Sequence, residues 1–339
     1  MVATGSKATT SFQSESSRKY GLLLPHFGQA ADRRDITTLA TQVEELGFDS
    51  VWVRDHIVYR PHGSEDSNRL FVEAFVTMSA VAAVTQKLIL GTAALIPFRH
   101  PVHTAHLLGS LEWLAGPGRV IAGVGLGTFD HEFEAVGMPS TSRAELVREQ
   151  VAILRKLWAG DPNHDGPSYR FQDIAISPTP SPPIPIYSCG SSYAAVRRAV
   201  EYCDGWLPAR MPLREFQLRI SKLRELADAS GREAPKVAAM PIVVPGRTVE
   251  EASKRLDIGA LAAEGARFYP TPPEGYRSVR DLTGAVIAGP PAEIAGQVKV
   301  LEESGAEHVI FDLRHSDSVR DSAELLAHEV LPWLRMTAS

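Results

Sequence analysis

The sequence predicts an α/β fold, a (β/α)8 TIM barrel with insertion loops. Its 339 residues alternate between short apolar runs of strand character and longer segments with helical periodicity. Eight such apolar runs can be counted, and eight parallel strands are the number that closes this barrel. A doubly wound open sheet is the alternative, because periodicity does not show whether a sheet closes.

The first strand and helix illustrate the pattern. "YGLLLP" at 20–25 is a short apolar run, and residues 35–46 then carry Ile36, Leu39 and Val43 at helical spacing. Gly47 follows as a C-cap glycine would. The remaining strands are expected at residues 50–54, 88–94, 120–126, 184–189, 204–208, 236–244 and 308–313.

Other segments fall outside this alternation. Residues 1–18 are rich in small and hydroxyl side chains without an apolar face, which predicts a disordered tail before a single barrel domain at 19–339. Residues 161–185 and 257–283 carry clusters of Pro or Gly and are expected to be insertions. The second insertion and the loop at 59–69 are expected to shape the substrate pocket.

Composition restricts the kinds of partner. The net charge of −5 and the pI near 6.1 argue against nucleic-acid binding, because such proteins usually carry a basic surface. No apolar run reaches the roughly 18 residues that a membrane-spanning helix needs. The two cysteines, Cys189 and Cys203, occur without a secretory signal pattern, so we expect a cytoplasmic protein that acts on a small molecule.

Three ionisable residues, Arg54, Asp55 and His56, follow the buried-strand sequence "VWV". In a parallel barrel the C-terminal strand ends form the active site, which makes Asp55 and His56 candidate catalytic groups. His26 follows the first strand in the same way and is a candidate substrate contact. Simple capping of the strand-to-helix turn by Asp55 and His56 is the structural alternative.

A candidate phosphate site follows the fifth strand. Gly190, Ser191 and Ser192 open a helix directly after the strand, so the backbone N–H groups and the positive end of the helix dipole favour an anion there. Plain helix capping by Ser191 or Ser192 is the alternative. Cys189 would border this site, and it is expected to be a small hydrophobic residue and not a nucleophile.

Candidate metal ligands are poorly spaced. His103 and His106 lie one helical turn apart but lack partner ligands, and Asp130, His131 and Glu132 are adjacent and point in different directions. We therefore expect no metal, and a solvated loop or a cofactor contact at the second cluster.

Several stretches together resemble one known family. They are "LGFDSVWVRDH", "LGTAAL", "GRVIAGVGLG", "FEAVG" and "CGSSYAAVRRAVEYCDGWLP", and they occur in the family's order. The chain is similar to the luciferase-like monooxygenase superfamily, (β/α)8 enzymes that use flavin or deazaflavin and include bacterial luciferase. The Asp-His pair resembles the branch that depends on coenzyme F420.

The resemblance implies a set of cofactor-binding positions. They are Ala93, Ala94, Gly127, Thr128, His131, Cys189, Gly190, Ser191 and Ser192. It also implies a cis peptide bond between Ala93 and Ala94 behind the cofactor ring, and pairing of the barrels as homodimers.

The activity that the resemblance implies is hydride transfer between F420 and a small organic substrate. His56 would act as acid or base, which suits histidine because its unperturbed pKa is near neutrality, and Asp55 would orient it or contact the cofactor. The alternatives are an FMN-dependent monooxygenase that uses O2 and a non-catalytic flavin-binding protein. Phe27, Arg60 and Thr128 depart from the sugar-phosphate dehydrogenase pattern and argue against glucose 6-phosphate as substrate.

Overall fold

The computed structural model describes residues 18–32, 35–65, 67–138, 142–272 and 275–336. Within it, eight parallel strands form a closed barrel in the order β1-β12-β9-β8-β7-β4-β3-β2, which confirms the predicted fold. The barrel strands are β1 (Lys19–Leu23), β2 (Ser50–Val53), β3 (Ile89–Thr92), β4 (Val120–Val124), β7 (Ile186–Cys189), β8 (Gly205–Leu207), β9 (Lys236–Ala239) and β12 (His308–Phe311).

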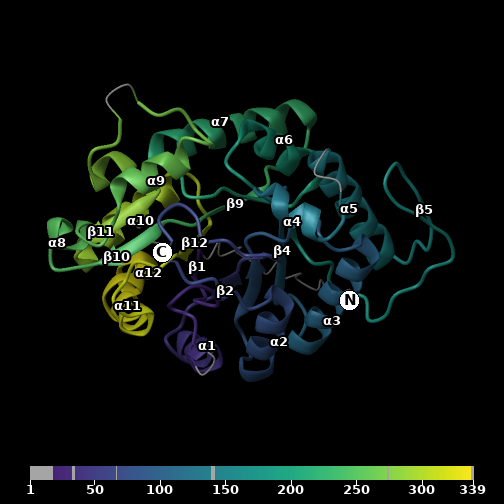
Figure 1. Ribbon diagram of the computed structural model, residues 1–339, viewed down its shortest axis with the longest axis horizontal. Coiled ribbons are helices and arrows are strands. Elements are labelled where there is room, and N and C mark those ends of the chain that lie inside the picture. The colour runs from purple at the N-terminus through teal and green to yellow at the C-terminus, as the bar shows by residue number, and fades with distance from the viewer. Residues whose placement is uncertain (1–17, 33–34, 66, 139–141, 273–274, 337–339) are drawn as a thin grey trace, which may run out of the picture.

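Helices surround the barrel, as Figure 1 shows, and bury their apolar faces against the strands. The longer ones are α1 (Asp35–Glu45), α2 (Ala74–Val84), α3 (Pro101–Ala115), α5 (Arg143–Trp158), α6 (Tyr193–Tyr202), α7 (Leu213–Ser230) and α10 (Pro291–Ser304). The shorter ones are α4 (Asp130–Ala135), α8 (Val249–Ser253), α9 (Ile258–Gly265), η1 (Val279–Leu282), α11 (Val319–Leu325), η2 (Leu326–Val330) and α12 (Leu331–Met336). Within the described ranges, none of these helices has the length and apolarity to cross a membrane.

The predicted seventh strand, 236–244, is wrong as a single element. β9 leaves the barrel at Ala239, and after Pro241 the chain forms β10 (Ile242–Pro245), which pairs in parallel with β11 (Val286–Gly289) outside the barrel. Proline has no N–H to donate to a ladder, so the strand is interrupted there. The strand β11 was not predicted.

The two predicted insertions have short elements of their own. Residues 161–185 contain the antiparallel pair β5 (His164–Asp165) and β6 (Arg170–Phe171), which projects from the barrel in Figure 1. The second insertion, 257–283, contains α9 and η1. Its helix α9 brings Glu264 toward the barrel rim, where this side chain pairs with Arg210.

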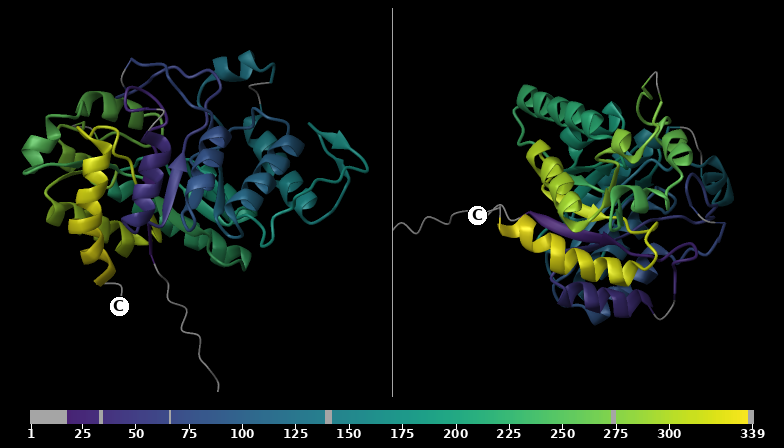
Figure 2. Two further views of the ribbon diagram at one scale, coloured as in Figure 1. Left: turned by 90° about the horizontal axis from the view of Figure 1, so that it is seen from below. Right: turned by 90° about the vertical axis from the view of Figure 1, so that its left-hand side faces the viewer.

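The C-terminal helices close the barrel beside its first elements. Both views of Figure 2 show α11 and α12 alongside α1. Gln42 of α1 is hydrogen bonded to Glu324 of α11, and Arg18 forms an ion pair with Glu302 of α10 at 2.8 Å. The predicted division into a tail and a barrel domain stays a prediction, because residues 1–17 lie outside the described part of the chain.

The barrel interior holds a large aromatic side chain that depends on a neighbouring glycine. Trp52 of β2 is fully buried, and its ring lies against Gly91 of β3, its partner in the strand register. A Cβ atom at Gly91 would lie 2.3 Å from the ring. Trp52 is also held by a hydrogen bond from its Nε1 to Ser50 Oγ, at 2.9 Å, so the ring has little freedom to move away.

We therefore predict that Gly91→Ala lowers the free energy of unfolding by about 1–3 kcal/mol, as expected for overpacking. Gly296→Ala is the matched control, since Gly296 lies in α10 and a Cβ atom there meets nothing within 4 Å. Urea unfolding followed by circular dichroism measures both. Equal stability of the two variants would contradict the packing that we describe.

Candidate active site

The C-terminal ends of the barrel strands carry most of the predicted site residues. Because the barrel strands are parallel, their C-terminal ends lie at one rim. Arg54, Asp55 and His56 leave this rim directly after β2. Each of them pairs with a different element, and these pairings organise the site.

His56 is held by a glutamate of α4. Its Nδ1 lies 2.9 Å from Glu132 Oε2, while Glu132 Oε1 accepts hydrogen bonds from the backbone N–H groups of Ile57 (3.0 Å) and Val58 (3.2 Å). Burial opposes ionisation of Glu132, but the hydrogen bond from His56 and these N–H groups lower its pKa below the usual range. Glu132 is therefore a buried anion that orients the imidazole.

The other nitrogen of His56 faces Arg54. The Arg54 Nη2 atom lies 3.1 Å from His56 Nε2. A guanidinium only donates hydrogen bonds, so Nε2 is the acceptor and the neutral ring carries its hydrogen on Nδ1, toward Glu132. In this arrangement the basic nitrogen of His56 is occupied by the hydrogen bond from Arg54.

Asp55 has a different partner from the one expected. Both of its carboxylate oxygens bind Arg99, at 2.8 and 2.9 Å, and Oδ2 also accepts from the N–H of Ile96 at 3.0 Å. Asp55 is buried and thus fixes the loop after β3, while Glu132 takes the role of orienting His56. The orienting role expected for Asp55 is corrected accordingly.

The loop that Asp55 fixes carries Ala93 and Ala94. The peptide bond between them is cis, which confirms the expectation from the family resemblance. Across the rim, a Cβ atom at Gly125 would lie 3.0 Å from the Ala94 Cβ and 3.9 Å from the Cys189 Cβ. The ends of β3, β4 and β7 therefore form a surface of mainly small side chains, bordered by Ile96, whose Cδ1 would lie 3.4 Å from the same Cβ atom.

Cys189 belongs to this surface and is partly exposed. Burial of its sulfur raises the pKa of the thiol well above its usual range, so the nucleophilic thiolate is disfavoured. Cys203 is buried and unpaired as well, and burial raises its pKa to about 12. Both residues are packing groups in this structure.

Next to this surface lies the start of α6. Gly190 has φ +134°, and its carbonyl accepts from Trp206 Nε1 at 2.9 Å. The Ser192 hydroxyl accepts from the N–H of Ala195 at 3.1 Å. Ser192 therefore caps the helix, which is the alternative to phosphate binding that the sequence left open. Capping uses one hydroxyl and one N–H only, and the other first-turn N–H groups have no partner within the helix. The Gly190 N–H already donates to the carbonyl of Leu207 and the Ser191 hydroxyl to that of Ala209, so a phosphate beside 190–192 would have to use the N–H groups of the first turn of α6, and phosphate binding there stays a prediction.

The remaining predicted cofactor positions follow β4. Gly127 has φ +73° and its carbonyl accepts from Arg143, at 3.1 Å. Thr128 is exposed, and His131 Nε2 lies 2.9 Å from the carbonyl of Val58, which ties α4 to the loop after β2. Their contact with a cofactor stays a prediction.

His26 is fully buried beneath the rim. Its Nδ1 lies 2.8 Å from the carbonyl of Val72, and its Nε2 accepts from the backbone N–H of Arg54 at 2.9 Å. Burial lowers its pKa to about 4, so the ring is neutral near pH 7. Direct contact with a substrate, which the sequence predicts, would require this segment to move; in this structure His26 positions Arg54.

The part of the rim formed by the segments after β2 and β12 carries a group of ion pairs that the sequence did not predict. Glu65 accepts from Arg54 and Arg314, and Asp312, directly after β12, pairs with Arg314 and Arg210. The strand-end rule, applied to "FDLRH" after the last strand, would have indicated Asp312 and Arg314. Glu65 gave no such signal, because its pairings join segments far apart in the sequence. Glu132 was noted only within the 130–132 cluster, and the solvated loop expected there is wrong for Glu132, which is buried against His56.

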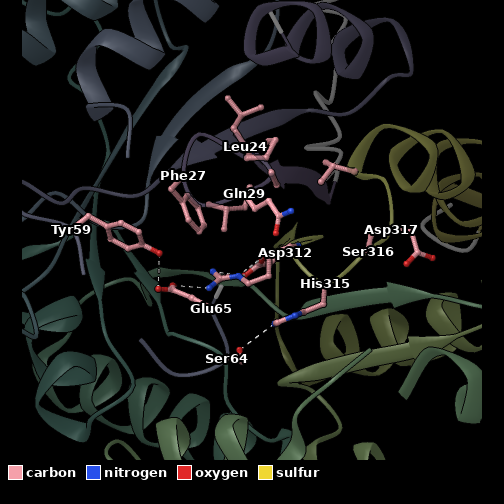
Figure 3. Close-up of a pocket in the computed structure, with 15 residues that line it drawn as sticks. Leu24, Phe27, Gln29, Tyr59, Ser64, Glu65, Asp312, His315, Ser316 and Asp317 are labelled. Carbon is pink, nitrogen blue, oxygen red and sulfur yellow. Dashed lines mark hydrogen bonds and ion pairs between the residues drawn. The ribbon is translucent and has the colours of Figure 1, made fainter. Parts of the chain in front are cut away.

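Beside these ion pairs lies a cavity of about 510 Å³, shown in Figure 3. It is bounded by the segments after β1, β2 and β12. The Tyr59 hydroxyl points at Glu65 across one wall, 2.7 Å from Oε2. As for metals, the described residues contain no cluster of three or more His, Cys, Asp or Glu side chains that could hold an ion.

A closed parallel barrel with ionisable groups at the C-terminal rim is the architecture of (β/α)8-barrel enzymes. This chain belongs to the luciferase-like monooxygenase family, whose model matches residues 13–308.

Two relatives show what the chain is similar to. It is 28% identical over 322 residues to the F420-dependent glucose-6-phosphate dehydrogenase of Beutenbergia cavernae, covering 89% of this chain and 94% of that protein. It is 27% identical to the F420-dependent hydroxymycolic acid dehydrogenase of Mycobacterium tuberculosis, covering 94% and 89%.

Two solved structures share the fold. One is an F420-dependent secondary alcohol dehydrogenase in complex with an F420-acetone adduct, with a TM-score of 0.77, 22% identity, and coverage of 94% of this chain and 99% of that one. The other is the FMN-bound oxygenating constituent of 3,6-diketocamphane monooxygenase from Pseudomonas putida, with a TM-score of 0.73, 19% identity, and coverage of 94% and 98%.

Proposed function

We propose that this protein is an oxidoreductase that transfers a hydride between coenzyme F420 and a small organic substrate. The observation that carries the proposal is one juxtaposition at the rim. In the barrel order, the small residues Ala93, Ala94 and Gly125 at the ends of β3 and β4 lie between the imidazole of His56 after β2 and the candidate anion site at 190–192 after β7. The F420-dependent relatives cover nearly the whole chain and support this choice of cofactor.

The residues present fit a deazaflavin with a phosphate group. Ala93 and Ala94 would lie against the ring, and Gly190, Ser191 and Ser192 would hold the phosphate, with Cys189 between the two. Gly127, Thr128 and His131 would provide further contacts. When bound, F420 supplies a carbon centre that accepts or donates a hydride.

In the proposed reaction His56 handles the proton. In this structure the Nε2 lone pair accepts from Arg54, so a substrate hydroxyl must first displace that N–H. Nε2 can then take the hydroxyl proton, or return it to a carbonyl oxygen, and the Glu132 carboxylate stabilises the resulting imidazolium. Arg54, 3.1 Å from the same nitrogen, can donate a hydrogen bond to that substrate oxygen. Asp55 acts indirectly, by fixing the loop that carries Ala93 and Ala94 through Arg99.

Cofactor choice is tested by titration. We predict that oxidised F420 binds the purified protein with a Kd at least tenfold lower than that of FMN. The same deazaflavin without its phosphate-bearing side chain should bind more weakly than F420, because it cannot use the start of α6. Cofactor fluorescence measures all three. A preference for FMN would instead favour the O2-using monooxygenase, the alternative function.

Turnover separates an enzyme from a non-catalytic flavin-binding protein. Given a substrate found by screening alcohols and carbonyl compounds with F420, we predict that His56→Ala lowers kcat about 10²–10⁴-fold and leaves F420 affinity within about threefold. Glu132→Gln should lower kcat by less, because it removes only the orienting partner. His103→Ala, on the exposed side of α3, is the control. Full turnover by His56→Ala would remove His56 from the reaction.

The proposal includes a homodimer and a cytoplasmic location. Val84 ends α2, and Trp113 and Leu114 lie in the last turn of the parallel helix α3; these side chains are 40%, 72% and 57% exposed. Exposed apolar side chains of this size favour an interface. The two free cysteines fit a reducing compartment.

We predict that the protein sediments as a dimer at micromolar concentration and that Trp113→Glu makes it monomeric. Trp333→Glu, at a similarly exposed tryptophan of α12, should leave the dimer intact. Analytical ultracentrifugation of the three proteins gives the answer. A monomeric wild-type protein would contradict the proposed assembly.

A further inference from the structure

The cavity beside the rim has one apolar wall and one charged wall. Leu23, Leu24, Phe27 and Val319 provide apolar surface, and the opposite side is polar. The polar lining residues are Gln29, Tyr59, Ser64, Glu65, Asp312, Arg314, His315, Ser316 and Asp317. A volume of about 510 Å³ lies within the range of small-molecule sites. The chemistry of its charged wall therefore restricts what it can hold.

Three arginines and three acids alternate in that wall and behind it. In the order in which they pair, they are Glu264, Arg210, Asp312, Arg314, Glu65 and Arg54. Arg314 lies 2.7 Å from Asp312 and 3.0 Å from Glu65. Arg210 lies 3.1 Å from Asp312 and 2.6 Å from Glu264. Each guanidinium is thus matched by carboxylates of the protein itself.

Glu65 is the central member on the cavity side. Besides Arg54 and Arg314 it accepts from the Tyr59 hydroxyl and from the N–H of His62, so it is firmly held. Burial opposes its ionisation, but the Arg54 and Arg314 guanidiniums lower its pKa to about 2. It is therefore an anion at any physiological pH, and it occupies the place where an anionic ligand would bind these arginines.

The charged wall connects the cavity to His56. Arg54 contacts both Glu65 and His56 Nε2, and the Tyr59 ring packs on the His56 ring with centroids 5.4 Å apart. The Phe27 ring lies beneath both arginines. The guanidinium carbons of Arg54 and Arg314 are 4.6 and 5.3 Å from its centroid. The Phe27 ring therefore supports the two arginines that pair with Glu65.

We propose that this cavity is the substrate site and that it selects uncharged organic compounds carrying a hydroxyl or carbonyl group, with Glu65 as the residue that excludes anions. The inference rests on the proposed function for the identity of the reaction. An anionic substrate would face the Glu65 and Asp312 carboxylates and would have to displace Glu65 from two guanidiniums. An uncharged compound can place its apolar part on Leu24, Phe27 and Val319 and its oxygen toward Tyr59, whose ring packs on His56.

Binding of matched probes tests this selectivity. Cyclohexanol and 4-hydroxycyclohexanecarboxylate share a ring and a hydroxyl and differ in one carboxylate. Titration calorimetry of the full chain loaded with F420 should give wild-type protein at least tenfold higher affinity for cyclohexanol. Glucose 6-phosphate should behave like the carboxylate. Tighter binding of either anion to the wild-type protein, or no binding of cyclohexanol, would overturn the proposal.

The role of Glu65 is tested by an isosteric variant. Glu65→Gln leaves Arg54 and Arg314 without this anion, so affinity for the carboxylate probe should rise at least tenfold relative to cyclohexanol. Glu264→Gln is the matched control: it releases only Arg210, which does not line this cavity, and the ratio should stay as in wild type. An unchanged ratio in a folded Glu65→Gln protein would remove Glu65 from selectivity.

The same probes, titrated into the protein without cofactor, separate this inference from the proposed function. Selective cyclohexanol binding without F420 binding would leave the cavity assignment standing and refute the cofactor. F420 binding with no preference between the probes would leave the cofactor standing and refute the cavity assignment.

Discussion

The rim of this barrel depends on one constraint: three consecutive ionisable residues leave a buried strand, and each must find a partner. Arg54 pairs with Glu65 in the loop after β2, Asp55 with Arg99 after β3, and His56 with Glu132 in α4. Unpaired charges at this depth would be strongly destabilising. The three pairings therefore fix the positions of three loops relative to one strand end.

This constraint divides the rim into two halves. On one side, the loop held by Asp55 presents Ala93 and Ala94 beside Gly125 and the start of α6, a surface suited to a flat, phosphate-bearing cofactor. On the other side, the cavity between the segments after β1, β2 and β12 is suited to an uncharged substrate. His56 is joined to the cavity half through Arg54 and Glu65, and to α4 through Glu132.

Most of the fold could be predicted from the sequence, because strand and helix periodicities are local properties. The eight barrel strands were expected in the right places, apart from the run 236–244, whose apolar character continues past Pro241 while the barrel ladder does not. The strand β11 was missed because it pairs with β10. The prediction of one barrel strand at 236–244 had already assigned most of β10 to the barrel.

The site was less predictable, because it depends on contacts between distant segments. Asp55 and His56 were identified by their place at a strand end, but the orienting role expected for Asp55 is wrong, while the cofactor contact given as its alternative stays a prediction. Consecutive residues after a strand point in different directions, so Asp55 and His56 meet different partners. Glu132, which lies 76 positions after His56, provides the orienting carboxylate. Similarly, the Glu65 to Arg314 pairing spans 249 positions, and no local pattern reveals it.

The most direct test of this division of the rim is a crystal structure of the protein with oxidised F420. We predict electron density for the deazaflavin ring against Ala93 and Ala94 and for the phosphate at Gly190, Ser191 and Ser192, with the cavity beside Glu65 still free for a substrate. Density for the ring within that cavity, or for the phosphate among Arg54 and Arg314, would contradict both the assignment of the two halves and the role of Glu65.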